Sequence, residues 1–215
     1  MKAVLGVIST LFIIASPFVL YWTLTHRDVT VASLTLLAWV ALRAIPIVLT
    51  AKKEQRRAAL QLPAIGLVFA LLGLVSKNGV WLLVLPSATQ ATFGLTFLRS
   101  LRGTPLIEHF ARMMDPDLGV PQQAHCRRWT KYWAYYLFAL AALGLVVAAT
   151  CSLAVWTLYA GVISYGMVGV LFAFEYVVRK LEFRDYNRKN PIDFVLSLLA
   201  PPRPVPAVDA KDVAP

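Results

Sequence analysis

The longest uncharged run of the chain extends from Tyr132 to Phe174 and contains no Asp, Glu, Lys, Arg or His in 43 residues. The hydrocarbon core of a bilayer is about 30 Å thick, and a helix needs about 20 residues to cross it. The run is therefore long enough for two crossings, joined by a turn near residues 152–157. Because Lys131 precedes it and Arg179 follows it, we expect a helical hairpin whose two ends lie on the same side of the membrane.

Four more apolar stretches precede this hairpin, separated by short polar segments. Together they predict an all-α, polytopic integral membrane protein with a single six-helix membrane domain over residues 1–200. The predicted spans are residues 3–25, 29–51, 58–76, 79–98, 132–154 and 157–178. A polar loop, residues 99–131, is expected to contain a short interfacial helix, and the C-terminal segment another. The Pro-rich residues 201–215 predict a disordered cytoplasmic tail.

The distribution of charge predicts the orientation. Only 15% of residues are charged and 59% are hydrophobic, whereas about a quarter of a soluble domain is usually charged. With the N-terminus inside, 18 of the 21 Lys and Arg residues fall in segments on the cytoplasmic side. We therefore predict a multi-pass membrane protein with both termini in the cytoplasm. The net charge of +10 is explained by these segments, so the lipid bilayer, and not nucleic acid, is the expected partner.

The polar loop contains the first candidates for chemistry. Residues 104–115 predict an amphipathic helix capped by Thr104, with Glu108 and His109 on its polar face. Its predicted apolar face consists of Leu106, Ile107, Phe110, Met113 and Met114. The catalytic His–Asp motif of glycerolipid acyltransferases has four intervening residues, whereas five separate His109 from Asp115. We therefore interpret this helix as interfacial.

No group of residues has the spacing of a metal or nucleophile site. His125 and Cys126 are adjacent, but a metal site needs three or four converging ligands. Along a helix, Cys126 and Cys151 would lie about 37 Å apart, and a disulfide needs Cα atoms within about 7 Å. We therefore predict no catalytic residue, cofactor, metal site or intramolecular disulfide.

Two ionisable residues, Arg43 and Glu175, fall within predicted spans. Such residues are rare in membranes and usually have a partner. Both are expected in the inner third of the bilayer, so one hypothesis is an ion pair between helices. The alternatives are that each side chain reaches the interface separately, or that Glu175 pairs with Arg179 one turn along its own helix.

Four aromatic residues recur at helical spacing where the fifth span leaves the cytoplasm: Trp129, Tyr132, Trp133 and Tyr136. We interpret them as part of an interfacial aromatic belt. The alternative is a flat aromatic surface that receives a polyunsaturated or aryl acyl chain.

Four motifs between Gly103 and Arg184 resemble a family of bacterial inner-membrane proteins associated with aryl polyene and xanthomonadin-type pigment biosynthesis clusters. The motifs are Thr104-Pro-Leu-Ile-Glu-His-Phe-Ala-Arg112, Cys126-Arg127-Arg128-x-Thr130-x-x-Trp133, Trp156-x-Leu-Tyr159-x-Gly161-x-Ile163-Ser-Tyr165 and Phe174-Glu175-Tyr-x-x-Arg179. The segment from Gly103 to Ile107 is more distantly similar to intracellular septation protein A. The candidate functional or structural polar residues are Arg43, Glu108, His109, Arg127, Arg128, Trp133, Tyr159, Glu175 and Arg179.

The resemblance implies a non-catalytic accessory protein of aryl polyene biosynthesis. Such a protein would dock an acyl carrier protein or polyketide-type biosynthetic enzymes at its basic cytoplasmic face, or handle the product at the membrane. A septation-type scaffold of the cell envelope is the first alternative. A membrane-bound acyltransferase or a small transporter is the second.

Overall fold

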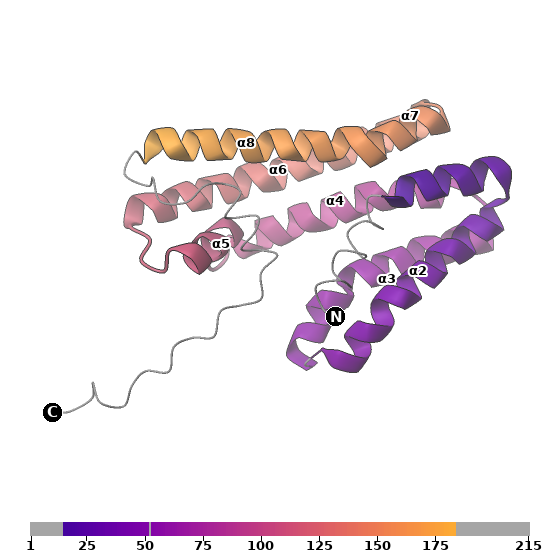
Figure 1. The fold of residues 1–215 in the computed structure, drawn as a ribbon, viewed down its shortest axis with the longest axis horizontal. Helices are drawn as coiled ribbons and strands as arrows, with labels where there is room; N and C mark the ends of the chain where they lie inside the picture. The colour runs from indigo at the N-terminus through magenta and orange to yellow at the C-terminus, as the bar shows by residue number, and fades with distance from the viewer. Residues whose placement is uncertain (1–14, 52, 184–215) are drawn as a thin grey trace. The chain divides into compact units, whose positions relative to one another are not determined.

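A computed structural model describes residues 15–51 and 53–183, and the regular structure of this part of the chain is entirely helical. A helix that includes residues 15–26 comes first. It is followed by α2 (Val29–Thr50), α3 (Lys53–Ser76), α4 (Val80–Ser100), α5 (Leu106–Met114), α6 (Val120–Thr150), α7 (Leu153–Leu158), the π-helical turn η1 (Tyr159–Ile163) and α8 (Ser164–Glu182) (Figure 1). The predicted C-terminal helix and tail lie outside the described residues, as do residues 3–14 of the first predicted span.

Five described segments are long and apolar enough to cross a membrane. They are Val29–Leu49, Ala59–Ser76, Val80–Ser100, Val120–Thr150 and Leu153–Glu182. The all-helical fold and the multi-pass character are thus borne out, and the last four segments correspond to the predicted third to sixth spans. The sixfold count depends on a first span that is described only from residue 15 onward.

The predicted loop at residues 99–131 contains more helix than we expected. α6 begins at Val120, 12 residues before the predicted start of the fifth span. Pro121 suits the first turn of a helix, and the Gly119 N–H donates to Gln122 Oε1 at 2.6 Å. Because hydropathy marks only the part of a helix that can cross a bilayer, it missed these first turns of α6.

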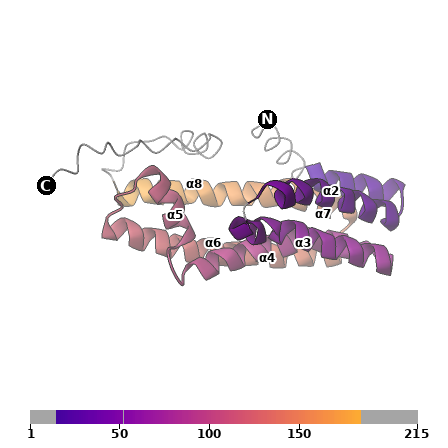
Figure 2. The same cartoon turned by 90° about the horizontal axis from the view of Figure 1, so that it is seen from below.

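The chain divides into two units, Met1–Glu175 and Tyr176–Pro215. In the first unit, α4 lies along α6, α2 along α3 and α3 along α4 (Figure 1), and α5 lies beside the beginning of α6 (Figure 2). In the second unit the described residues form the end of α8, where the Phe183 N–H donates to Arg179 O at 3.0 Å.

Small residues allow α4 and α6 to approach closely. A Cβ atom added at Gly144 would overlap Ser87 Oγ and lie 3.1 Å from Tyr159 Cε1. One added at Gly94 would lie 3.1 Å from the carbonyl oxygen of Ala134. Such contacts are typical of membrane helices, which associate mainly through close packing.

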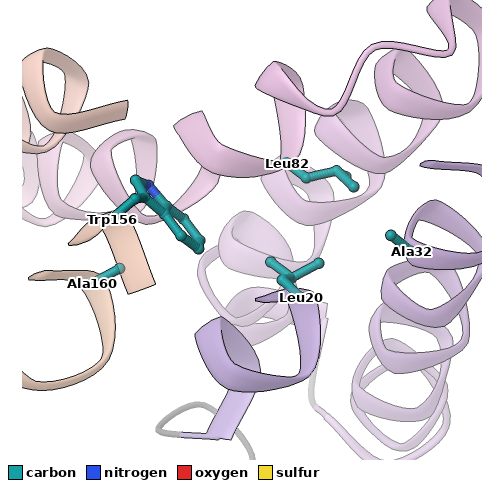
Figure 3. Close-up of a cluster of buried hydrophobic side chains, with 5 residues drawn as sticks. All are labelled: Leu20, Ala32, Leu82, Trp156 and Ala160. Carbon is teal, nitrogen blue, oxygen red and sulfur yellow. The ribbon is translucent and has the colours of Figure 1, made fainter. Parts of the chain in front are cut away.

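A second buried cluster joins five helical segments and contains Leu20, Ala32, Leu82, Trp156 and Ala160 (Figure 3). Leu20 lies between Trp156 on one side and Ala32 and Leu82 on the other (Figure 3). Trp156 is 1% exposed, and its indole N–H donates to Leu83 O at 3.1 Å. The packing and this hydrogen bond fix α7 against α4.

The turn η1 interrupts the regular helix of the segment Leu153–Glu182. The Ser164 N–H donates to the carbonyl oxygen of Tyr159, five residues earlier, which is the π-helical pattern. Tyr159, Ala160 and Gly161 of this turn are all buried. The turn therefore lies in the packed interior of the first unit.

Candidate functional site

The segment from Arg99 to Lys131, which we call the platform, is ordered by hydroxyl groups from both neighbouring helices. Ser100 Oγ on α4 accepts from the Leu106 N–H at 3.0 Å. Thr130 Oγ1 on α6 accepts from the Ile107 N–H at 3.4 Å and donates to Cys126 O at 2.8 Å. The first amides of a helix have no partner within it. The two hydroxyls bond the first two amides of α5. The N-cap of α5 is Pro105, so the prediction that Thr104 caps the helix was wrong.

Glu108 is a structural residue of the platform. Its side chain is buried, and Oε1 accepts from Arg112 Nε at 2.9 Å and from Arg112 Nη2 at 2.7 Å. Arg112 Nη1 also donates to Pro116 O at 3.2 Å. A charge-assisted pair of this kind is stronger than a neutral hydrogen bond. Through Arg112, the pair joins the middle of α5 to the turn that follows. The Glu108 carboxylate is thus already bonded within the platform.

The predicted division of α5 into an apolar and a polar face was wrong in part. Ile107 and Ala111 are buried with Glu108 against the rest of the platform. Glu108, which we placed on the polar face, is buried, whereas Phe110 and Met113 of the predicted apolar face are 36% and 68% exposed. The difference arises because the Glu108–Arg112 pair satisfies a carboxylate on the packed face of α5.

The polar candidate His109 is exposed on α5, where its ring meets the edge of Phe110 with 6.1 Å between ring centroids. This contact adds a polar group to the exposed apolar surface. His109 therefore lies beside Phe110 and Met113, an arrangement that does not resemble a catalytic histidine–carboxylate pair.

The exposed charge of the platform is mainly basic, with Asp117 as an exposed carboxylate in the turn before α6. Arg127, Arg128 and Lys131 are exposed at the beginning of α6, and Arg99 and Arg102 are exposed at and after the end of α4. Arg127 Nη2 donates to Leu101 O at 2.7 Å, which brings the two groups of basic residues together. The predicted candidates Arg127 and Arg128 thus lie on the surface of the platform.

Trp133 and Glu175 form a buried polar contact between α6 and α8. The Trp133 indole N–H donates to Glu175 Oε2 at 2.6 Å, and the two residues are 4% and 8% exposed. An N–H that bonds to a carboxylate satisfies a buried charge that would otherwise be costly. The contact joins the second and fourth of the motifs on which the family resemblance rests.

Aromatic rings surround this contact. Trp133 lies between Phe97 and Phe172, with centroid separations of 5.9 and 4.5 Å, and Trp129 lies 5.8 Å from Phe174. Trp129 and Trp133 are almost fully buried, whereas Tyr132 is 51% exposed. The interpretation of Trp129 and Trp133 as belt residues was therefore wrong. Periodicity alone did not distinguish a face that packs on α8 from a face that meets lipid.

Arg43 does not take part in this contact. It is exposed on α2, and Trp133 satisfies the Glu175 carboxylate. An ion pair between Arg43 and Glu175 is therefore not formed, and the exposed arginine fits the alternative in which it reaches the interface separately. Arg179 lies in the second unit, where its carbonyl oxygen accepts from Phe183.

Tyr159 is also a packing residue. Its hydroxyl donates to Leu140 O on α6 at 2.7 Å, and its side chain is 6% exposed. A carbonyl that is already bonded within α6 accepts this second bond, which ties η1 to the middle of the neighbouring helix. Tyr136 makes a similar bond, from its hydroxyl to Met167 O at 2.9 Å.

Several residues that order the platform carried no recognisable signal in the sequence. Ser100 and Thr130 each contribute one hydroxyl that accepts from an amide of α5. Because Ser and Thr are common on helices, their presence alone did not indicate this role. His125 and Cys126 were placed in a loop but are buried on α6. Residues 126, 129, 130 and 133 are buried, and they recur at helical spacing. This pattern would have indicated the packed face of α6 if we had predicted that the helix begins at Val120.

Within residues 15–51 and 53–183, no three His, Cys, Asp or Glu side chains are close enough to hold a metal ion. No protein-family model, curated protein or solved structure matches the chain.

Proposed function

We propose that the chain is a non-catalytic accessory protein of a bacterial inner membrane that docks a soluble, acidic biosynthetic partner on the platform. The observation that carries this proposal is the exposure of Phe110 and Met113 on an ordered helix outside the apolar spans. Aromatic residues, Met and Arg are enriched at protein interfaces, and a central apolar anchor usually supplies most of the binding energy.

The charge of the platform favours an acidic partner. Its exposed basic residues lie on α4, α6 and the turn after α4, and its buried carboxylate is neutralised internally by Arg112. Complementary charge accelerates encounter and orients the partner. An acyl carrier protein of aryl polyene synthesis has the required character, and the resemblance of the four motifs supports this choice. The positive-inside distribution supports a six-span arrangement with the platform and both termini in the cytoplasm.

The polar residues of the motifs support a docking role over an enzymatic one. Trp133, Tyr159 and Glu175 make hydrogen bonds that join neighbouring helices, and Glu108 pairs with Arg112 within α5. The motif pattern is thus explained by the architecture of the platform and of α6 and α8.

The biosynthetic context is tested by deleting the gene in its own host. We expect a loss of the yellow, membrane-associated polyene, measured by absorbance of membrane extracts, with normal cell length. Filamentous cells with unchanged pigment would instead support the septation-type scaffold.

The docking surface is tested by changing Phe110 and Met113 to Ser in the full chain, reconstituted in lipid nanodiscs. Each anchor residue of an interface contributes about 2 kcal/mol, so binding of the host's acyl carrier protein should weaken at least tenfold. Val75→Ser, at an apolar position on α3 that is 82% exposed and lies outside the platform, is the control and should bind normally. Unchanged binding by the double variant would contradict the proposal and would assign Phe110 and Met113 to contact with lipid.

A further inference from the structure

One face of α6 changes from basic to apolar along the helix without interruption. Arg127, Lys131 and Tyr135 follow one another at intervals of four residues, and all three are exposed. The same face continues with Leu145 and Val146, which are 45% and 56% exposed. Side chains at this spacing lie one above another on a helix. The basic residues therefore stand directly above a surface that suits lipid chains.

We propose that Arg127, Lys131 and Tyr135 bind the phosphate headgroup of an anionic phospholipid. Arg127 and Lys131 also contribute to the basic charge of the platform, but this site does not need Phe110 or Met113 and so does not rest on the docking function proposed for α5.

The length of α6 places these residues at the height of lipid headgroups. The helix has 31 residues, whereas about 20 are needed to cross the hydrocarbon core. Counting back about 20 residues from Thr150 brings the boundary to Lys131. Arg127 then lies about 6 Å farther out and Tyr135 about 6 Å farther in, one helical turn in each direction.

The charge on this face needs a counter-ion. Arg127 and Lys131 are like charges one turn apart, an arrangement that destabilises a helix. The sequence of α6 contains no Asp or Glu. Arg102 adds a further exposed cation beside Leu101, whose carbonyl accepts from Arg127. A lipid phosphate would relieve this repulsion.

The three side chains supply complementary groups. The guanidinium of Arg127 uses Nη2 for Leu101 O, which fixes its position and leaves other N–H groups for a phosphate oxygen. Lys131 adds a flexible ammonium, and the hydroxyl of Tyr135, 62% exposed, can donate at the level of the glycerol esters. A zwitterionic lipid offers the same phosphate, but its choline adds a positive charge to a basic site.

The site is tested with the full chain in a mild detergent, to which phosphatidylglycerol, phosphatidylcholine or inorganic phosphate is added. Native mass spectrometry measures retained lipid, and the melting temperature provides a second readout. We expect phosphatidylglycerol to bind and to raise the melting temperature of the unmodified protein. Phosphatidylcholine and inorganic phosphate should change the melting temperature little. A basic residue near an anionic surface contributes about a factor of five in affinity. Arg127→Ala and Lys131→Ala should each weaken binding by about that factor, and Tyr135→Phe by less.

Arg27→Ala is the matched control, because Arg27 is an exposed cation between the first two helices and far along the sequence from α6. It should retain phosphatidylglycerol binding. Equal binding by the Arg127 and Lys131 variants would overturn the site. Equal stabilisation by inorganic phosphate would overturn the assignment to a lipid, and equal stabilisation by phosphatidylcholine would overturn the requirement for an anionic headgroup.

Discussion

At the scale of single residues, the hydrogen bond from Trp133 to Glu175 is the contact most open to measurement. Replacing Trp133 by Phe keeps a ring but removes the donor at 2.6 Å from the carboxylate. We expect a loss of about 1 kcal/mol in the free energy of unfolding, because a buried acceptor loses a partner. Combining Trp133→Phe with Glu175→Met should cost less than the sum of the single changes. Denaturation of the detergent-solubilised protein, analysed as a double-mutant cycle, provides the measurement.

The chain offers a control for this cycle at Trp129, one turn earlier on α6. Trp129 is as deeply buried as Trp133, but among the described residues its indole N–H has no hydrogen-bond partner. Trp129→Phe should therefore cost less than Trp133→Phe. Strictly additive losses for Trp133 and Glu175 would show that the two residues stabilise the protein independently.

At the scale of helices, the close approach of α4 and α6 makes Gly144 sensitive to substitution. A Cβ at this position would overlap Ser87 Oγ, so Gly144→Leu should separate the two helices. We expect a loss of about 3 kcal/mol or more, at the upper end of overpacking effects. Unfolding of the purified protein and the yield of folded protein both report this loss.

Gly169 on α8 is the matched position for comparison. An added Cβ there meets nothing within 4 Å. Gly169→Leu should change the free energy of unfolding by no more than about 0.5 kcal/mol, as is usual for surface substitutions. If both leucine variants were equally stable, the packing of α4 on α6 would not depend on the small residue.

The sequence predicted the spans of these helices better than their contacts. Hydropathy located α2, α3, α4 and α6 because uncharged stretches of about 20 residues are rare in soluble proteins. It could not show that Glu108 would be buried, since that depends on which face of α5 packs on the rest of the platform. It also could not choose among the faces of α6, because apolar residues face both lipid and neighbouring helices in a membrane.

At the scale of the whole molecule, the two cysteines report the orientation. Both are free thiols, Cys126 buried near the beginning of α6 and Cys151 exposed just after its end. With the N-terminus inside, Cys151 faces the periplasm. A membrane-impermeant maleimide should therefore label it in intact spheroplasts, whereas Cys126, at 1% exposure, should react only after unfolding.

The control for the labelling is Cys151→Ser, which should abolish the signal from intact spheroplasts. Labelling of Cys151 only after the membrane is opened would reverse the orientation and place the platform on the outside. The burial of Cys126 could not be predicted from the distribution of charged residues. It follows from the early start of α6, which turns a predicted loop residue into part of a packed helix face.

The π-helical turn η1 has a consequence for how the gene can change in length. Trp156 and Glu175 are buried and 19 positions apart. At about 100° per residue, a regular helix would point them about 100° apart, and the extra residue in η1 brings them onto one face. Loss of one codon within Tyr159–Ile163 would leave that alignment intact, because the helix would become regular. Loss of one codon between Ser164 and Phe174 would rotate Glu175 away from Trp133. Loss of one residue within η1 is therefore the length change that preserves the register of α8, whereas the same loss later in α8 does not.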